Sequence, residues 1–242
     1  MLTVITVTYN AEASIRDTLE SIVLCPFVNR IIIKDGISTD NTIRIINSFS
    51  DPRIEVHSVI DSGIYDAMNF AMQLVMVDDY FCFINSGDFL NVKAFSRCTE
   101  LKYPLIFFPV MIQNSKDQIW KLDVNFSKVV PRIHHQGIIV KMQTKRLLFD
   151  LEVGLMADLD WMLNLLHDNN QKFIVSKHFL STISTGGVSD VKSLARFLSY
   201  IKFCKKHKIS FVKTFDFYKI LLKIFLPYFL IDAFRLYHRR KY

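Results

Sequence analysis

The stretch Tyr80–Leu90 reads YFCFINSGDFL, an apolar run that stops in Asn85, Ser86, Gly87 and Asp88. Such a run bounded by turn residues is typical of a buried strand, and Gly87 permits the tight backbone that would present Asp88 at the strand's carboxyl end. Open α/β sheets bind ligands at that edge. A carboxylate there, beside Asn and Ser, offers the hard oxygen ligands that Mg²⁺ or Mn²⁺ prefers. The alternative is a polar turn with a helix cap.

Upstream of this stretch, apolar runs alternate with helical periodicity. The runs that predict strands are Leu2–Thr8, Arg30–Lys34 and Arg53–Val59. The helical patterns cover Ala11–Cys25, a segment that begins at Thr42, and Ile64–Val77. Strand and helix alternating at this spacing predict βαβ units and a parallel sheet. The loops after Thr8, Lys34 and Ile84 should then lie along one edge of one sheet.

Downstream, the pattern predicts further elements. Apolar runs predict strands at Tyr103–Met111, Ile119–Val124, Ile133–Val140 and Lys172–Ser184, the second returning antiparallel after a hairpin turn at Gln113–Asp117. Helical patterns cover Val92–Leu101 and Ala157–Leu166. His134 and His135, adjacent on a predicted strand, should point to opposite faces, so we expect no joint metal site from them.

The composition and the first residues of the sequence predict the cellular compartment of the protein. Half of the 242 residues are hydrophobic, which excludes a disordered chain. The four cysteines lie far apart without a CxxC pair, which predicts a reducing compartment and no structural zinc. The first ten residues, MLTVITVTYN, lack a basic region and a cleavage site, so we expect a first strand and not a signal peptide. The protein is therefore predicted to stay in the cytosol.

Four motifs together resemble a known family. They are T-Y-N at 8–10, D-G-x-S-x-D-x-T at 35–42, D-x-G-x-Y-D-A-M-N at 61–69 and N-S-G-D at 85–88. Each lies at or near the end of a predicted strand, and their order resembles that of a family 2 glycosyltransferase of the bacterial surface-polysaccharide type. The resemblance covers residues 2–190. It implies the α/β GT-A fold, a Rossmann-like nucleotide-binding mixed sheet flanked by helices.

The resemblance also implies roles for individual residues. The loops after the first two strands would hold the nucleotide of a sugar donor, and Asp61 and Gly63 would lie near the donor sugar or uridine. Asp88 would hold Mn²⁺ or Mg²⁺ with the donor diphosphate. The residues implied to contact the donor are Thr8, Tyr9, Asn10, Asp35, Asp61, Gly63, Asn85, Ser86, His135 and Gln136. For His135 a packing role in the core or at the rim remains the alternative.

The predicted helix at 157–166 carries the candidate base. In the resembled family an acidic pair at a helix start supplies it, and Asp158 matches the second position while Ala157 replaces the first. A carboxylate in the first turn is held ionised by the helix dipole, as a base must be. Asp160 is the rival and points about 200° away on a helix. Simple capping of the helix by Asp158 is the structural alternative.

The resemblance implies transfer of one sugar, with inversion, from a nucleotide-diphosphate donor, and a UDP-sugar is the expected donor. The acceptor would be a hydroxyl of a lipid-linked saccharide in cell-surface polysaccharide synthesis. The Q-x-x-R-W motif of processive synthases is absent, which favours single transfer. Because Asn85, Gly87 and Ala157 stand where many relatives carry acidic residues, a catalytically inactive nucleotide-sugar-binding scaffold is the alternative.

The charge divides the chain into two parts. Residues 191–242 hold thirteen basic and two acidic residues, a net charge of +11, and residues 1–190 hold 17 basic and 21 acidic residues, a net charge of −4. We therefore expect a glycosyltransferase domain at 1–190 and a basic amphipathic helical tail at 191–242. Basic residues beside Phe, Tyr and Leu favour the inner surface of the cytoplasmic membrane as its partner. Packing on the body or on a dimer partner is the alternative, and nucleic acid is not expected.

Overall fold

A computed structural model describes residues 1–95, 101–114, 119–126, 133–167, 172–184 and 194–210. The helices are α1 (Ile15–Val23), α2 (Thr42–Ile46), α3 (Ile64–Gln73), α4 (Val92–Phe95), α5 (Ala157–His167) and α6 (Leu194–Lys206), with 3₁₀ turns η1 (His135–Gly137) and η2 (Leu151–Met156). The strands are β1 (Leu2–Thr8), β2 (Arg30–Asp35), β3 (Ile54–Ser58), β4 (Tyr80–Phe83), β5 (Phe89–Leu90), β6 (Leu105–Phe107), β7 (Val110–Gln113), β8 (Ile119–Leu122), β9 (Ile138–Lys141), β10 (Phe173–Val175) and β11 (Ser181–Ser184).

The main sheet has seven strands in the order β10-β6-β9-β4-β1-β2-β3. All pairs are parallel except those of β9, which runs antiparallel to β4 and β6. The predicted mixed α/β fold is therefore confirmed, with the four predicted strands of the first ninety residues side by side.

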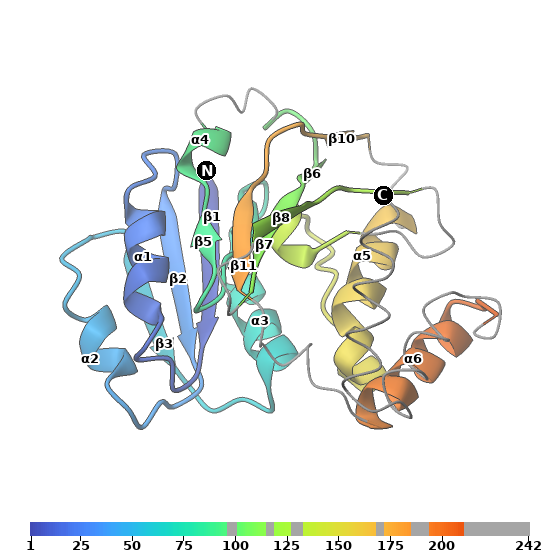
Figure 1. The fold of residues 1–242 in the computed structure, drawn as a ribbon, viewed down its shortest axis with the longest axis horizontal. Coiled ribbons are helices and arrows are strands. Elements are labelled where there is room, and N and C mark those ends of the chain that lie inside the picture. Colours follow the sequence, from blue (N-terminus) through green and yellow to red (C-terminus); the bar gives the residue numbers. More distant parts are fainter. Residues whose placement is uncertain (96–100, 115–118, 127–132, 168–171, 185–193, 211–242) are drawn as a thin grey trace.

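Helices cover both faces of this sheet (Figure 1). On one face α1 buries Ile15, Leu19 and Ile22 against residues of β1 and β2. On the other face α3 and α5 form a second core, in which Met68 and Trp161 are fully buried. The apolar stripes that the sequence predicts for these helices are the faces that meet the sheet.

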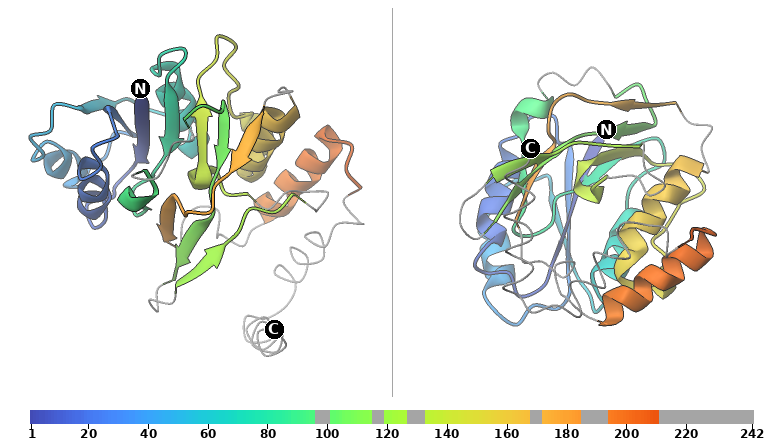
Figure 2. Two further views of the ribbon diagram at one scale, coloured as in Figure 1. Left: turned by 90° about the horizontal axis from the view of Figure 1, so that it is seen from above. Right: turned by 45° about the vertical axis from the view of Figure 1, so that its right-hand side comes forward.

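A second sheet of four strands, β5-β11-β7-β8, lies across the end of the main one (Figure 2). The single strand predicted at Tyr103–Met111 is wrong, because the chain leaves β6 at Phe108 and Pro109 and enters β7 in the other sheet. The strand predicted at Lys172–Ser184 likewise divides into β10 and β11. The predicted antiparallel return of Ile119–Val124 is confirmed, since β8 pairs with β7.

The described part of the basic segment forms α6, which packs on the body. Tyr200, Phe203 and Cys204 are buried against residues of η2 and α5, among them Val153 and Leu163. None of the described helices is long and apolar enough to cross a membrane. Residues 115–117 of the hairpin turn predicted at Gln113–Asp117 lie outside the described residues, as do 191–193 and 211–242 of the predicted tail.

Candidate active site

The candidate site lies where β1, β2, β3 and β4 end, because parallel strands bring their carboxyl ends to one edge. Thr8 ends β1 and is buried, and Tyr9, which follows it, is 63% exposed. Asn10 adopts φ 46°, a left-handed conformation that Asn tolerates better than most residues. Its amide nitrogen donates to Oγ of Ser38 at 2.8 Å, and its Oδ1 accepts from the amide of Thr39 at 2.8 Å. The loops after β1 and β2 are thus joined.

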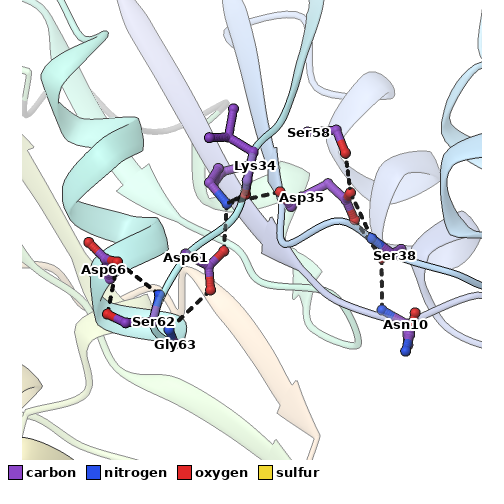
Figure 3. Close-up of polar contacts among 10 residues, drawn as sticks. Asn10, Lys34, Asp35, Ser38, Ser58, Asp61, Ser62, Gly63 and Asp66 are labelled. Atoms are coloured by element: carbon purple, nitrogen blue, oxygen red, sulfur yellow. Dashed lines mark hydrogen bonds and ion pairs between the residues drawn. The ribbon is translucent and has the colours of Figure 1, made fainter.

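Asp35 is completely buried at the end of β2. Its carboxylate accepts hydrogen bonds from the hydroxyl and amide of Ser38, at 2.5 and 3.0 Å, and from the hydroxyl of Ser58, at 2.6 Å (Figure 3). The carboxylate therefore fixes the backbone of the loop after β2, and it lies beneath the surface of that loop.

Asp61 is held by a buried lysine. Nζ of Lys34, whose side chain is 1% exposed, donates to Oδ2 of Asp61 at 2.5 Å and to the carbonyl of Val59 at 2.6 Å (Figure 3). A buried ammonium requires such partners, since an unpaired charge there would be costly. A Cβ at Gly36 would lie 3.1 Å from Asp61 and 3.3 Å from Tyr9, so the ends of three strands meet at this glycine.

Gly63 begins α3 just beyond Asp61. Its φ of 134° is a conformation that side chains rarely adopt, and its amide donates to Oδ1 of Asp61 at 3.0 Å. The structure thus brings together Tyr9, Asn10, Asp35, Asp61 and Gly63, all of which the sequence had assigned to the donor side.

The loop after β4 presents Asp88, which is 5% exposed. Gly87 adopts φ 94°, as the tight turn requires, and the amide of Asp88 closes it by donating to the carbonyl of Asn85 at 2.9 Å. Nε2 of Gln136 donates to Oδ2 of Asp88 at 2.7 Å, and the amide of Ser184 donates to Oδ1 at 3.2 Å. Burial raises the pKa of Asp88 to about 6, and these hydrogen bonds partly oppose it.

Asp158 begins α5 and faces the same region. Its Oδ2 lies 3.5 Å from Nδ1 of His135, and its side chain remains 24% exposed. Burial raises the pKa of Asp158, but the contacts with His135 and His134 outweigh that effect and hold it below the ordinary value. Burial raises the pKa of the Tyr65 hydroxyl, and the nearby charge of Asp158 raises that pKa further. Asp158 therefore stays ionised at neutral pH.

Asp160 differs from Asp158 in its surroundings. It is fully buried and accepts from Lys206 and Asn164, and its Oδ1 lies 2.8 Å from Nε2 of His207. As the helical geometry predicted, it points away from Asp158, toward α6.

The prediction that His134 and His135 point to opposite faces is wrong. Their rings are stacked, with centroids 5.2 Å apart and planes at 27°. The reason is local, because His134 is extended while His135 begins the 3₁₀ turn η1, so strand alternation does not apply. The predicted strand begins only at Ile138.

The residues around Asp88 fit a divalent ion shared with a diphosphate. Two amide oxygens, Oδ1 of Asn85 and Oε1 of Gln136, are buried without a hydrogen-bond partner among the described residues. In that same part of the chain, no three His, Cys, Asp or Glu side chains are grouped to hold a metal on their own. Mg²⁺ and its relatives are commonly bound by one or two carboxylates plus substrate phosphates. Asp88 is the candidate ligand, with Asn85 and Gln136 offering neutral oxygens beside it.

Four site residues were not assigned from the sequence. Tyr65 lies inside the quoted D-x-G-x-Y-D-A-M-N motif, which is a signal that could have found it. Lys34 closes a predicted strand, and Ser58 and Ser184 carried no signal, since their partners are distant in sequence.

Residues 3–101 match the sequence profile described as Glycosyl transferase family 2. No curated protein matched the chain. Similar solved structures include S. aureus TarS 1-349 in complex with UDP, with a TM-score of 0.62 and 16% identity over 84% of this chain and 65% of that one. For TarS 1-349 in complex with UDP-GlcNAc, the TM-score is 0.65 and the identity is 14%, over 92% of this chain and 70% of that one.

Another similar structure is the mannosyltransferase PcManGT from Pyrobaculum calidifontis in complex with GDP-Man and Mn²⁺. Its TM-score is 0.58 at 13% identity, over 84% of this chain and 64% of that one. At these identities the likeness establishes the fold. The chain spans about two thirds of the length of these proteins, by the 65% and 64% coverage.

Proposed function

We propose that the chain is a family 2 glycosyltransferase that transfers one sugar from a UDP-sugar to a hydroxyl of a lipid-linked saccharide, with inversion, which the matching profile and the GT-A fold of similar structures support. The observation that carries the proposal is that the short turn η1 contacts two carboxylates, those of Asp158 and Asp88. Consecutive residues of η1 contact them, His135 contacting Asp158 and Gln136 contacting Asp88. The carboxylate of Asp158 is partly exposed and ionised, whereas that of Asp88 is buried beside two oxygens that have no hydrogen-bond partner in the part of the chain that the structure describes.

The two carboxylates would serve opposite ends of the reaction. Asp158 would take the proton from the acceptor hydroxyl, whose oxygen attacks the anomeric carbon while the bond from that carbon to the diphosphate breaks. Asp88 would hold the divalent ion, which when bound neutralises the charge on the departing diphosphate. Gln136 orients Asp88, and His135 favours the ionised form of Asp158.

The donor class is supported by the named complexes of similar proteins. TarS binds UDP and UDP-GlcNAc, and PcManGT binds GDP-Man with Mn²⁺. The loops at Tyr9, Asn10 and Asp61 would hold the base and ribose. Asn85 and Ser86, beside Asp88, would face the phosphates.

The acceptor and the location form a further part of the proposal. The net charge of +11 in residues 191–242 supports docking on anionic lipid at the inner face of the cytoplasmic membrane, where a lipid-linked acceptor would lie. The full chain should sediment with vesicles that contain phosphatidylglycerol and leave them when salt is raised. Failure to bind such vesicles at low salt would contradict this part alone.

The function is tested by thermal unfolding with UDP-, GDP-, dTDP- and CMP-sugars, each with and without Mn²⁺. A ligand that binds only the folded state raises the midpoint by an amount that grows with the ratio of its concentration to its dissociation constant. We expect stabilisation by UDP-sugars that depends on Mn²⁺ and is lost in Asp88→Ala. Asp17→Ala, which removes an exposed aspartate of α1, is the control and should behave as wild type.

Three other outcomes have distinct meanings. Stabilisation by another nucleotide class would correct the donor, and stabilisation without turnover would favour the inactive scaffold. If no nucleotide sugar stabilises the protein under any condition, the proposal fails.

A further inference from the structure

The helix α6 is anchored to the segment that leads into the candidate base. Its apolar side, with Tyr200 and Phe203, packs on Val153 and Met156 of η2, and η2 continues directly into α5. Figure 2 shows α6 lying outside α5, on the side away from the main sheet. Part of the basic segment 191–242 therefore packs on residues that lie within a few positions of Asp158 in the sequence.

A glycine and a serine form the first polar anchor. Oγ of Ser199 accepts from the amide of Leu155 at 3.1 Å and donates to the carbonyl of Ala195 at 2.7 Å. Gly154 adopts φ 70°, and a Cβ there would lie only 2.6 Å from that Oγ. The glycine is required both for its backbone conformation and for the close approach of α6.

The second anchor is a buried carboxylate two residues after Asp158. Asp160 is fully buried, and its oxygens lie 2.9 Å from Nζ of Lys206 and 2.8 Å from Nε2 of His207, at the end of α6. Lys206 also contacts Asp150, just before η2, at 2.7 Å. Burying a carboxylate is unfavourable unless it is paired, so α6 must be in place for α5 to keep this geometry.

The two anchors lie on either side of Asp158 in the sequence. Ser199 fixes Leu155, three residues before it, and Asp160 fixes the helix two residues after it. The first turn of α5 is thereby held at both ends by the same helix. Arg196, in the first turn of α6, also lies near enough to act electrostatically on Tyr65, a neighbour of Asp158.

We propose that Ser199 and Asp160 are positioning residues, which hold the first turn of α5 so that Asp158 faces the acceptor. This inference rests on the proposed function, because it assigns the base role to Asp158. The role explains why polar anchors occur where apolar packing alone would stabilise the contact at least as well, since directional bonds fix the orientation of a side chain. The first helix of the basic segment is then a component of the active site.

The test uses the full-length protein and water as the acceptor. Water attacks the anomeric carbon, the bond from that carbon to the diphosphate breaks, and the proton goes to Asp158, so that UDP and the free sugar are released. UDP release from UDP-GlcNAc, or from the nucleotide sugar selected by thermal unfolding, gives kcat and KM, and UDP binding is measured separately by thermal shift.

Ser199→Ala and Asp160→Asn should lower kcat by about tenfold or more, because misplacement of a catalytic group by about 1 Å has effects of that size. KM and the UDP-induced shift should stay within about twofold of wild type, since the donor loops are untouched. Leu198→Ala, which changes an exposed neighbour of Ser199, should leave all three values unchanged. If Asp160→Asn does not fold, Lys206→Gln takes its place in the test, because it removes the same ion pair at a side chain that is 37% exposed.

The inference is overturned if the folded variants keep the wild-type kcat, or if the loss appears in KM and UDP binding instead. A wild type that neither binds nor hydrolyses any nucleotide sugar would remove the proposed function, and the inference with it. A wild type that hydrolyses the donor while the variants match it would remove the inference alone.

Discussion

Nδ1 of His135 lies 3.5 Å from Oδ2 of Asp158, and the next residue along the chain, Gln136, donates a hydrogen bond to Asp88. One short turn thus contacts both carboxylates of the candidate site. Because η1 is itself buried, a change on one side of the turn is transmitted to the other.

The first prediction concerns Asp158→Asn. The amide cannot accept the acceptor proton, so turnover should fall by about 10²- to 10⁴-fold, the usual range for loss of a general base. The Mn²⁺-dependent stabilisation by UDP should persist, because Asp158 is not among the donor-binding loops. Asp78→Asn, at a side chain that is 78% exposed, should keep full turnover. Equal losses of turnover and UDP binding in Asp158→Asn would argue against the base role.

The second prediction concerns the pH dependence of stability in EDTA. The folded-state pKa of Asp88 is about 6, above its ordinary 3.8, so the folded state binds a proton more tightly than the unfolded state. Stability should therefore increase as pH falls from 7 to 5, by about 1 kcal/mol from this group. We expect this increase in the free energy of unfolding between pH 7 and pH 5, measured by urea unfolding, to be absent in Asp88→Asn. An identical difference in wild type and variant would show that other groups cause it.

A third prediction concerns the buried ammonium of Lys34. Lys34→Met leaves the carboxylate of Asp61 and the carbonyl of Val59 without their donor, and should destabilise the protein by about 3 kcal/mol. Removing both charges in Lys34→Met/Asp61→Asn should restore part of this loss, since no uncompensated charge remains. Urea unfolding measures both values. A free energy of unfolding for Lys34→Met within about 0.5 kcal/mol of the wild-type value would contradict the pairing of Lys34 with Asp61.

A fourth prediction concerns Gly137, which follows the two site residues of η1. A Cβ there would lie 2.5 Å from the carbonyl oxygen of Phe108 and 2.9 Å from Val110. Gly137→Ala should cost about 1–3 kcal/mol, as overpacking does, because backbone must move. Turnover of the folded fraction should also fall, since η1 carries His135 and Gln136. Unchanged thermal stability would exclude the close contact.

Much of the first ninety residues was predictable because β1, β2 and β4 are largely apolar, buried runs followed by turn residues. Strand ends fix where loops meet, so the gathering of Tyr9, Asp35 and Asp88 along one edge followed from the order of elements alone. The hydrogen bond from Ser184 to Asp88 could not be predicted, since the two residues lie 96 positions apart in the chain and meet only because β11 pairs with β5.

The errors have local physical causes. In Tyr103–Met111 both β6 and β7 are apolar, so periodicity showed no break between them, and only Pro109, which lacks an amide hydrogen, marked the change of sheet. The strand predicted at Arg30–Lys34 ends on a lysine whose side chain is buried and paired with Asp61, 27 residues later. Charged residues of this kind are misjudged whenever the partner is remote in sequence.

The hydrogen bonds of Asp88 span 48 and 96 residues of the chain. During synthesis, the candidate metal site therefore cannot be completed until Ser184 has left the ribosome. An emerging chain would present its β1 to β4 loops before the carboxylate of Asp88 has its hydrogen bonds from Gln136 and Ser184. The candidate metal site is thus completed late in synthesis, by a residue that lies 96 positions beyond the carboxylate that it contacts.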